Sequence, residues 1–384
     1  MTFESDYREL ESQYIMPAFS REIMITKGSG CTVTDADGKQ YLDLVAGIAV
    51  CSTGHCHPKV VKAITDQATE LIHCSNLYYV PHQGALAKKL VEISGLPGKA
   101  KAFFSNSGAE AMEGALKLAR IRTGKKEVVA CEGGFHGRTM GSLACTHKPA
   151  IRDPFMPLQP FTKFVPYGDA EALKAAITSE TAAVVLEPIQ GEGGVITPPA
   201  GYLKQVREIC DDKGVLLIVD EVQSGMGRTG QWFAFQEDGI LPDVITMAKA
   251  IASGFPMGAI VAREGLEFGK SEHGSTFAGG PIACAAALAS IDVIGELLPE
   301  VAVKGERFRA ALAHLNPRVR GLMIGITIGD QCADVQKECA AHGLLVNCAA
   351  HGNLRLVPPL TITNDEIDRA TGIINAAVSK FART

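Results

Sequence analysis

The sequence predicts an α/β fold with a mostly parallel central sheet, and two observations carry that prediction. Short apolar runs of strand length alternate with stretches of helical periodicity from Pro58 onwards. Several of these runs, such as 215–219, contain only apolar residues, which is typical of strands covered on both faces. The 384 residues are enough for one large domain and a smaller one.

The elements follow in order along the chain. The first twenty residues are expected to form an arm and a short helix, and residues near 22–50 to form strands around the turn Asp35-Ala-Asp-Gly38. Strands are then predicted at 102–105, 127–131, 183–187, 215–220, 244–247 and 258–262. Helices are predicted from Pro58 and over 108–122, 201–213 and 281–297.

The two ends of the chain are expected to meet in the smaller domain. Strands near 321–328 and a last helix from Asp365 predict an α+β segment at the C-terminus. We expect residues 1–50 to be the N-terminal part of the small domain and 51–280 to be the large domain. Residues 281–384 then supply a linking helix and the rest of the small domain.

Composition restricts the class of partner. Charged residues make up 21% of the chain, the net charge is −5 and both signs are interspersed, so neither nucleic acid nor a membrane is predicted as a partner. We expect no apolar run long enough to span a bilayer and no signal peptide in the first residues, so a cytoplasmic location is predicted.

The cysteines and their neighbours predict no metal site. Eleven cysteines scattered through a long chain suit reduced thiols better than a disulfide framework. Cys51, His55, Cys56 and His57 are close in sequence, but no second ligand pair stands at zinc-finger spacing. This run is therefore interpreted as a tight turn before the helix at Pro58.

Lys249 is the first candidate for chemistry. It follows the apolar strand 244–247, and no other charge lies between Asp243 and Arg263, so its pKa is expected to be lowered. A neutral amine is a nucleophile that forms Schiff bases, although an isolated lysine at a strand end is more often a solvated one. Asp220 ends the neighbouring apolar run, and a lysine with an aspartate at two strand ends is what pyridoxal phosphate requires.

Other strand ends carry glycine-rich turns. Ser107-Gly108-Ala109 opens a helix, where free N–H groups can bind phosphate or where Ser107 and Glu110 can simply form a capping box. The turn 133–138 carries Phe135, which could stack on a flat ring, and Arg138, which could hold a carboxylate. His136, in the same turn, is interpreted as structural.

Together these motifs resemble the class III, or subgroup II, pyridoxal-phosphate aminotransferases of fold type I. The resemblance runs from about residue 15 to the C-terminus and is strongest for the branch that acts on N2-acetylornithine. The runs that carry it are Gly47-Ile-Ala-Val50, Gly54-His-Cys-His-Pro58, Ser75-Asn-Leu-Tyr-Tyr79, Phe135-His-Gly-Arg138, His273-Gly-Ser-Thr276, Gly343-Leu-Leu-Val-Asn347 and Leu354-Arg-Leu-Val-Pro-Pro359.

The resemblance implies a role for each cofactor-binding residue. Lys249 would bind pyridoxal phosphate covalently and Asp220 would pair with its ring nitrogen. The other residues implied at the cofactor are Ser107, Gly108 and Ala109 at the phosphate, Phe135 stacked on the ring, Val222, Gln223 near the ring hydroxyl, and Thr276 at the phosphate of the neighbouring subunit. A homodimer with shared active sites follows from that last role.

It also implies the substrates. Arg138, with Ser275 beside it, would hold the α-carboxylate of the acylated diamine, and Arg355 the α-carboxylate of glutamate or 2-oxoglutarate. Glu192 would be a switch acid that pairs with Arg355 while the amine donor is bound. Two departures from the family pattern are Ala109, in place of a common threonine, and the stretch Phe277-Ala-Gly-Gly280.

The activity so implied is transfer of the ω-amine of N2-acetylornithine to 2-oxoglutarate, in the biosynthesis of arginine and possibly lysine. Another ω-aminotransferase acting on succinyldiaminopimelate, ornithine, 4-aminobutyrate or a carrier-bound lysine precursor would share the same core residues. An aminomutase or decarboxylase would keep Lys249 and Asp220 but would not need a keto acid. A non-catalytic protein on the same scaffold is disfavoured because both residues are present, and a dehydrogenase because no G-x-G-x-x-G follows an early strand.

Overall fold

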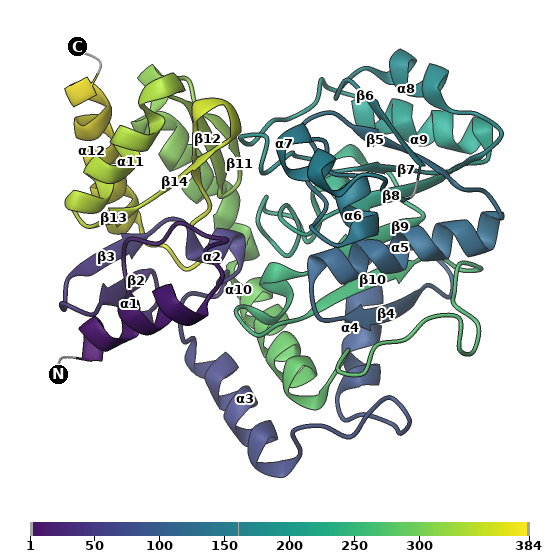
Figure 1. Ribbon diagram of the computed structural model, residues 1–384, viewed down its shortest axis with the longest axis horizontal. Coiled ribbons are helices and arrows are strands. Elements are labelled where there is room, and N and C mark those ends of the chain that lie inside the picture. The colour runs from purple at the N-terminus through teal and green to yellow at the C-terminus, as the bar shows by residue number, and fades with distance from the viewer. Residues whose placement is uncertain (1–2, 160, 382–384) are drawn as a thin grey trace.

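A seven-stranded sheet lies at the centre of the larger lobe in the computed structural model, which describes residues 3–159 and 161–381 (Figure 1). In spatial order the strands are β4 (Lys101–Ser105), β10 (Gly258–Ala262), β9 (Val244–Met247), β8 (Leu216–Asp220), β7 (Thr181–Leu186), β5 (Glu127–Cys131) and β6 (Phe161–Val165). Neighbours from β9 to β6 pair in parallel, whereas β10 is antiparallel to both β9 and β4. The predicted α/β class with a mostly parallel sheet is confirmed.

The sheet is buried on both faces because its strands carry apolar side chains at consecutive positions. Val184 and Leu217 belong to one hydrophobic core, and their neighbours Val185 and Ile218 to a second core on the opposite face. The helices packed on the sheet are α4 (Gln83–Ser94), α5 (Gly108–Thr123), α8 (Ala170–Ala176) and α9 (Tyr202–Lys213). This double cover leaves the strand ends as the place where polar groups can meet a ligand.

The smaller lobe combines both ends of the chain, as the purple and yellow segments in Figure 1 show. One sheet has the order β1 (Ile25–Ser29), β2 (Thr32–Asp35), β3 (Gln40–Asp43) and β13 (Leu344–Leu345). The other has the order β11 (Arg318–Arg320), β12 (Met323–Thr327), β15 (Asn353–Leu356) and β14 (Asn347–Ala349). Because β13 pairs in parallel with β3, one sheet joins the two ends. We propose that the domains divide after residues 50 and 280.

The remaining elements are helices and short turns. The α-helices are α1 (Phe3–Tyr14), α2 (Ala46–Ala49), α3 (Pro58–Glu70), α6 (Met140–Ala144), α7 (Pro149–Arg152), α10 (Pro281–Ala311), α11 (Cys332–Ala341) and α12 (Asn364–Phe381). The 3₁₀ turns are η1 (Asp153–Phe155), η2 (Ala234–Asp238), η3 (Lys249–Ala252), η4 (Ala313–Leu315), η5 (Gly329–Gln331) and η6 (Ala350–Gly352).

Helix α10 differs from the prediction in length and in its apolar character. It continues past Pro299 to Ala311, because buried residues such as Val301 and Phe308 extend its core-facing side. Contrary to the expectation of no membrane-length run, its best 18-residue window has a mean hydropathy of 1.7 and is long enough to cross a bilayer. However, 56% of that window is buried within the protein, where α10 packs against α3 and η3. We therefore interpret α10 as a core helix.

One pair of cysteines also differs from the expectation of reduced thiols. Cys332 at the start of α11 and Cys348 on β14 form a disulfide, while the other nine cysteines are free. The two residues are 16 positions apart and meet only because α11 packs against β14. The bond therefore joins these two elements of the smaller lobe.

Candidate active site

Lys249 lies at the end of the central strand β9, where a short turn replaces the strand. It begins η3 with a positive φ of 47°, a left-handed conformation that L-residues with side chains seldom adopt. The side chain is partly buried. Burial lowers the pKa of Lys249 below its ordinary value, although the carboxylates of Glu192 and Asp220 oppose the change. The lowering expected from its apolar neighbours is confirmed.

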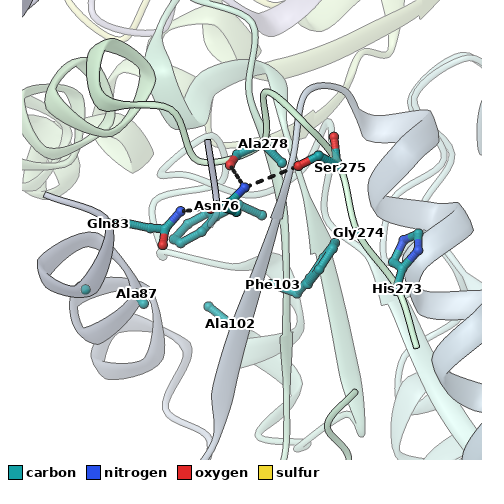
Figure 2. Close-up of a pocket in the computed structure, with 11 residues that line it drawn as sticks. Asn76, Gln83, Ala87, Ala102, Phe103, His273, Gly274, Ser275 and Ala278 are labelled. Carbon is teal, nitrogen blue, oxygen red and sulfur yellow. Dashed lines mark hydrogen bonds between the residues drawn. The ribbon is translucent and has the colours of Figure 1, made fainter. Parts of the chain in front are cut away.

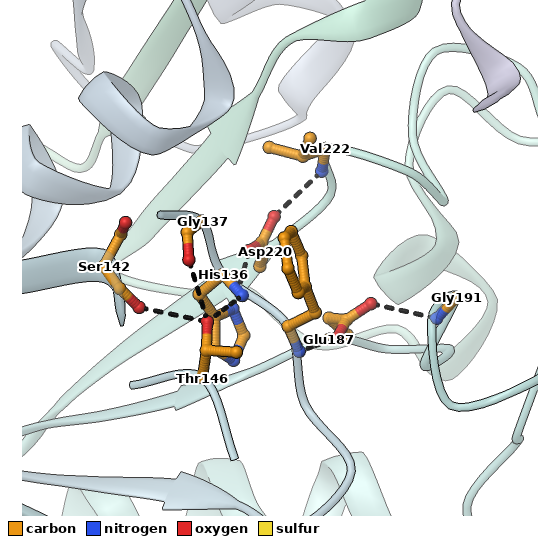
Figure 3. A network of polar contacts seen from close by, with 9 residues as sticks. His136, Gly137, Ser142, Thr146, Glu187, Gly191, Asp220 and Val222 are labelled. Carbon is orange, nitrogen blue, oxygen red and sulfur yellow. Dashed lines mark hydrogen bonds and ion pairs between the residues drawn. The ribbon is translucent and has the colours of Figure 1, made fainter. Parts of the chain in front are cut away.

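Asp220 ends the adjacent strand β8 and is held in a buried network of polar groups (Figure 3). Its Oδ2 lies 2.7 Å from His136 Nδ1, and its Oδ1 accepts the N–H of Val222 at 3.0 Å. Burial of the His136 ring opposes the charged form, but the hydrogen bond and the charge of Asp220 prevail and raise the pKa of His136. His136 is thus the partner that holds Asp220, in agreement with its interpretation as structural.

The neighbouring Glu221 takes no part in this network. Its carboxylate accepts Ser224 Oγ at 2.6 Å and the N–H of Phe235 at 2.9 Å, away from the partners of Asp220. Burial raises the pKa of Glu221 to about 7. The two acids have separate partners, which agrees with the alternation of side chains along a strand.

Glu187, at the end of β7, connects two loops of the site. Its Oε1 accepts the N–H of Phe135 at 2.9 Å, and its Oε2 accepts the N–H of Gly191 at 3.0 Å (Figure 3). Burial raises the pKa of Glu187 to about 7, while the nearby charge of His136 acts against this. The sequence predicts a strand that ends at residue 187, but the contacts of Glu187 with these two loops have no local sequence signal.

The N-terminus of α5 has the features of an anion cradle. Ser107 Oγ accepts the N–H of Glu110 at 3.2 Å, whereas the Glu110 carboxylate accepts the N–H of Asn106 rather than completing a capping box on Ser107. Among the described residues, the N–H groups of Gly108 and Ala109 have no acceptor. A Cβ on Gly108 would stand 2.9 Å from Val222 Cγ1, so the backbone approaches the Asp220 strand end closely.

Arg355 is buried on β15, with only 1% of its side chain exposed, and is surrounded by acceptors. Its Nη1 donates to Glu192 Oε1 at 2.5 Å and to Gln223 Oε1 at 3.0 Å. Its Nε and Nη2 both donate to Asn347 Oδ1, at 3.0 and 2.8 Å. Burial opposes ionisation of Glu192, but Arg355 prevails and lowers the pKa of that carboxyl, with Lys249 contributing.

Arg138 and Phe135 lie together on the turn after β5. The guanidinium carbon of the exposed Arg138 stands 5.8 Å from the centre of the Phe135 ring, which is half-buried. Within residues 3–159 and 161–381, Arg138 has no ion pair. Its charge is therefore available to an anion, and a cation above an aromatic face is a favourable arrangement.

Ser275 and Thr276 lie on a loop that borders a cavity of about 360 Å³ between α4 and β4 (Figure 2). Asn76 Nδ2 donates to the backbone oxygens of Ser275 and Ala278, at 3.2 and 2.9 Å, and fixes the loop. Asn106 Nδ2 donates to Ser275 Oγ at 3.1 Å, which places Ser275 beside the cradle at α5. Thr276, the next residue, is exposed, and within the described part of the chain it makes no hydrogen bond with the other predicted site residues.

The structure thus brings most of the predicted residues into three groups. Val222 bonds to Asp220 and lies close to Gly108, Arg355 contacts Glu192 and Gln223, and Phe135 contacts Arg138. Thr276 stands apart from these groups. The residues whose roles the sequence did not reveal are His136 as a partner of Asp220, Glu187 as a link between loops, and Asn347 as a partner of Arg355.

These groups define what the site can do chemically. A lysine of lowered pKa can act as a nucleophile and as a proton carrier. A buried carboxylate can hold a protonated ring nitrogen, and unpaired N–H groups at a helix N-terminus can bind a phosphate. Two arginines, one free and one masked by a glutamate, can recognise carboxylates at two positions.

Comparison with known proteins agrees with this chemistry. Residues 15–378 match the family described as aminotransferase class-III. The chain is 53% identical over 377 residues to the acetylornithine aminotransferase of Methanosarcina mazei, covering 96% of this chain and 95% of that protein. It is 47% identical to the acetylornithine aminotransferase of Methanocaldococcus jannaschii, with 98% of each chain covered.

Solved structures of related enzymes have the same fold. The ornithine aminotransferase of Toxoplasma gondii is 32% identical, with a TM-score of 0.94 and coverage of 100% of this chain and 96% of that one. The N-acetylornithine aminotransferase of Stenotrophomonas maltophilia is 34% identical, with a TM-score of 0.83 and coverage of 98% and 99%. The chain therefore belongs to the class-III aminotransferases, which are pyridoxal-phosphate-dependent enzymes of fold type I.

Proposed function

We propose that this enzyme transfers the ω-amino group of N2-acetylornithine to 2-oxoglutarate, giving N-acetylglutamate 5-semialdehyde and glutamate in arginine biosynthesis. The names of the relatives that are 46–53% identical support this substrate. The observation that carries the proposal is the ion pair between Glu192 and the buried Arg355. An enzyme whose first substrate presents an ω-amine and whose second presents an α-keto acid needs a carboxylate-binding arginine that can be masked, and Glu192 can mask Arg355.

The residues present fit pyridoxal phosphate. The unpaired N–H groups of Gly108 and Ala109, capped by Ser107, would bind the phosphate with the positive end of the α5 dipole. Asp220 would hold the protonated ring nitrogen, and Phe135 would cover one face of the ring. Val222 and Gln223 would contact the ring, and Lys249 would attach to the aldehyde carbon. The close approach of Gly108 to Val222 supports a shared pocket for phosphate and ring.

The chain's own groups then carry the proton chemistry. When bound, pyridoxal phosphate supplies an aldehyde carbon that condenses with amines and a ring that accepts the electron pair of the broken C–H bond. Lys249 Nζ, once free of the cofactor, would take the proton from the substrate carbon that bears the amine and return it to the aldehyde carbon of the cofactor. Its lowered pKa favours the neutral amine that this role needs. His136 keeps Asp220 oriented by its hydrogen bond.

Two arginines distinguish the two substrates. The free guanidinium of Arg138, with Ser275 nearby, would hold the α-carboxylate of the acylated donor, which leaves the ω-amine at Lys249. While the donor is bound, Glu192 neutralises Arg355, so Arg355 does not attract a substrate carboxylate to the place where the ω-amine reacts. When 2-oxoglutarate enters, Glu192 moves off and Arg355 binds its α-carboxylate. The partly exposed side chain of Glu192, at 36%, leaves room for that movement, whereas Arg355 is fixed.

A homodimer with shared sites is part of the proposal. Large apolar side chains beside Thr276 are exposed, including Leu77, Tyr78 and Phe277 at 84%, 71% and 68%. A second copy covering this surface would carry Thr276 to the phosphate of its neighbour. We also propose a cytoplasmic location. A role in lysine biosynthesis, in addition to the one in arginine biosynthesis, remains part of the proposal.

A panel of amine donors tests the substrate. With 2-oxoglutarate as acceptor, we expect kcat/KM to be highest for N2-acetylornithine, and lower for ornithine, 4-aminobutyrate and succinyldiaminopimelate. The T. gondii ornithine aminotransferase has a similar fold, so ornithine is the most informative comparison. A higher kcat/KM for any other donor would replace the proposed substrate while leaving the transaminase chemistry in place.

Arg138→Ala tests how the donor is held. We expect KM for N2-acetylornithine to rise by about 10- to 100-fold, because a hydrogen-bonded charge pair to the carboxylate contributes roughly 1.5–3 kcal/mol. For an ω-amine donor that has no α-carboxylate, KM should rise far less. The matched control is Arg307→Ala, which removes an exposed arginine paired with Asp368. Equal losses for both donors would remove Arg138 from the donor site.

A further inference from the structure

Asn347 lies directly opposite Arg355 in the pairing of β14 with β15. Its Oδ1 accepts hydrogen bonds from both Nε and Nη2, at 3.0 and 2.8 Å, so one oxygen holds an entire edge of the guanidinium. Its own amide nitrogen donates to the backbone oxygen of Cys348 at 3.2 Å, which fixes the orientation of the amide. The side chain of Arg355 therefore cannot rotate without breaking two hydrogen bonds.

The acceptors of Arg355 differ in charge on its two sides. Asn347 is neutral, whereas Glu192, on Nη1, is a carboxylate with a lowered pKa. Gln223, the other acceptor on Nη1, is neutral as well. When Glu192 leaves, the guanidinium keeps its orientation and its full positive charge. A carboxylate at position 347 would hold the same edge but would neutralise Arg355 permanently.

The strand that carries Asn347 is itself anchored. The N–H of Cys348 donates to Gln336 Oε1 at 2.9 Å, and Cys348 is joined to Cys332 by the disulfide. Both partners belong to α11, so β14 is fixed against a helix in addition to its pairing with β15. Asn347 is thus a preorganised acceptor, which is the arrangement that reduces the entropic cost of binding a ligand to Arg355.

We propose that Asn347 is a positioning residue for keto-acid recognition: it directs the Nη1 side of Arg355 toward the incoming carboxylate and leaves that charge uncompensated. The inference rests on the proposed role of Arg355. It assigns to Asn347 an effect on the acceptor alone, because Arg355 is paired with Glu192 while the amine donor is bound.

Asn347→Ala and Asn347→Asp test this inference. We expect each to raise KM for 2-oxoglutarate by about 10-fold or more, with Asn347→Asp at least as severe although it is nearly isosteric. At saturating keto acid, kcat should change little. The same preparations should accept an ω-aldehyde, which has no carboxylate at the reacting carbon, with little change in KM. That second acceptor shows that the variants are folded and loaded with cofactor.

Gln336→Ala is the matched control, because it removes a contact to the same strand without touching Arg355. Its KM for 2-oxoglutarate should change far less than in either Asn347 variant, because the disulfide between Cys332 and Cys348 still holds the strand to α11. The inference is overturned if either Asn347 variant has the parental KM for the keto acid, if the aldehyde is affected equally, or if Gln336→Ala reproduces the effect. Arg355→Ala separates the two proposals: an unchanged keto-acid KM in that variant would refute the role of Arg355 itself.

Discussion

Lys249→Ala removes transamination while the cofactor still binds without a covalent bond. We expect the rate to fall by at least about 10²–10⁴-fold, the range that positioned proton transfer contributes. Loss of the covalent attachment adds to this. Phosphate and ring contacts at Gly108, Ala109 and Asp220 do not depend on the lysine, so pyridoxal phosphate should remain bound. Single-turnover absorbance measurements with donor alone report the rate directly.

Two further variants show whether the loss of activity is specific to the amine of Lys249. Lys249→Arg keeps a positive charge but offers no amine that can lose its proton, so it should be as inactive as Lys249→Ala. Lys174→Ala removes an exposed lysine from α8 and should have parental activity. Substantial transamination by Lys249→Ala would refute the assignment of Lys249, because the proposed mechanism uses no other amine to hold the cofactor and move the proton.

Asp220→Asn is expected to have the second largest effect. An amide cannot hold a protonated ring nitrogen by charge, so we expect kcat to fall by about 10²–10³-fold, as when one preorganised electrostatic partner is removed. The amide also deprives buried His136 of its anion, and burial then favours the neutral imidazole. Steady-state kinetics and cofactor absorbance, recorded on the same preparation, measure both effects.

Asp243→Asn is the control for Asp220→Asn. Asp243 is a similarly buried aspartate just before β9, at the amino end of that strand, whereas Asp220 lies at the carboxyl end of β8; Asp243 pairs with Arg207 and Arg263. Its replacement should reduce stability without changing kcat or the absorbance of the folded enzyme. If the two variants lost kcat equally, the effect of Asp220 would be structural, and its role at the ring nitrogen would be wrong.

Much of the fold was predictable because local patterns determine it. Strands such as β9 and β10 and the helix at Pro58 appear where apolar runs and turn residues placed them. Strand direction could not be predicted in the same way. β10 is as apolar as the parallel strands of the sheet, and only the path of the chain between strands makes it antiparallel. β6 was not predicted: it is a mixed segment at the sheet edge, completed by pairing with β5.

The site residues that follow strands could be predicted from the sequence, whereas contacts between residues far apart in the sequence were harder to predict. Asp220, Lys249 and the Gly108 turn follow apolar strands, so their common location follows from a parallel sheet. The contact between Glu192 and Arg355 was expected from resemblance, and the geometry agrees. The contacts of His136 with Asp220 and of Asn347 with Arg355 are tertiary contacts, and the sequence around His136 and Asn347 carries no signal of them.

Borohydride reduction followed by peptide mapping tests whether Lys249 is the residue that holds the cofactor. The purified enzyme should be yellow, and reduction should bleach it and fix the cofactor to one residue. After digestion, mass spectrometry should find the added pyridoxyl group on the peptide that contains Lys249. Attachment to a different lysine, or a yellow enzyme that reduction leaves unlabelled, would refute the role of Lys249.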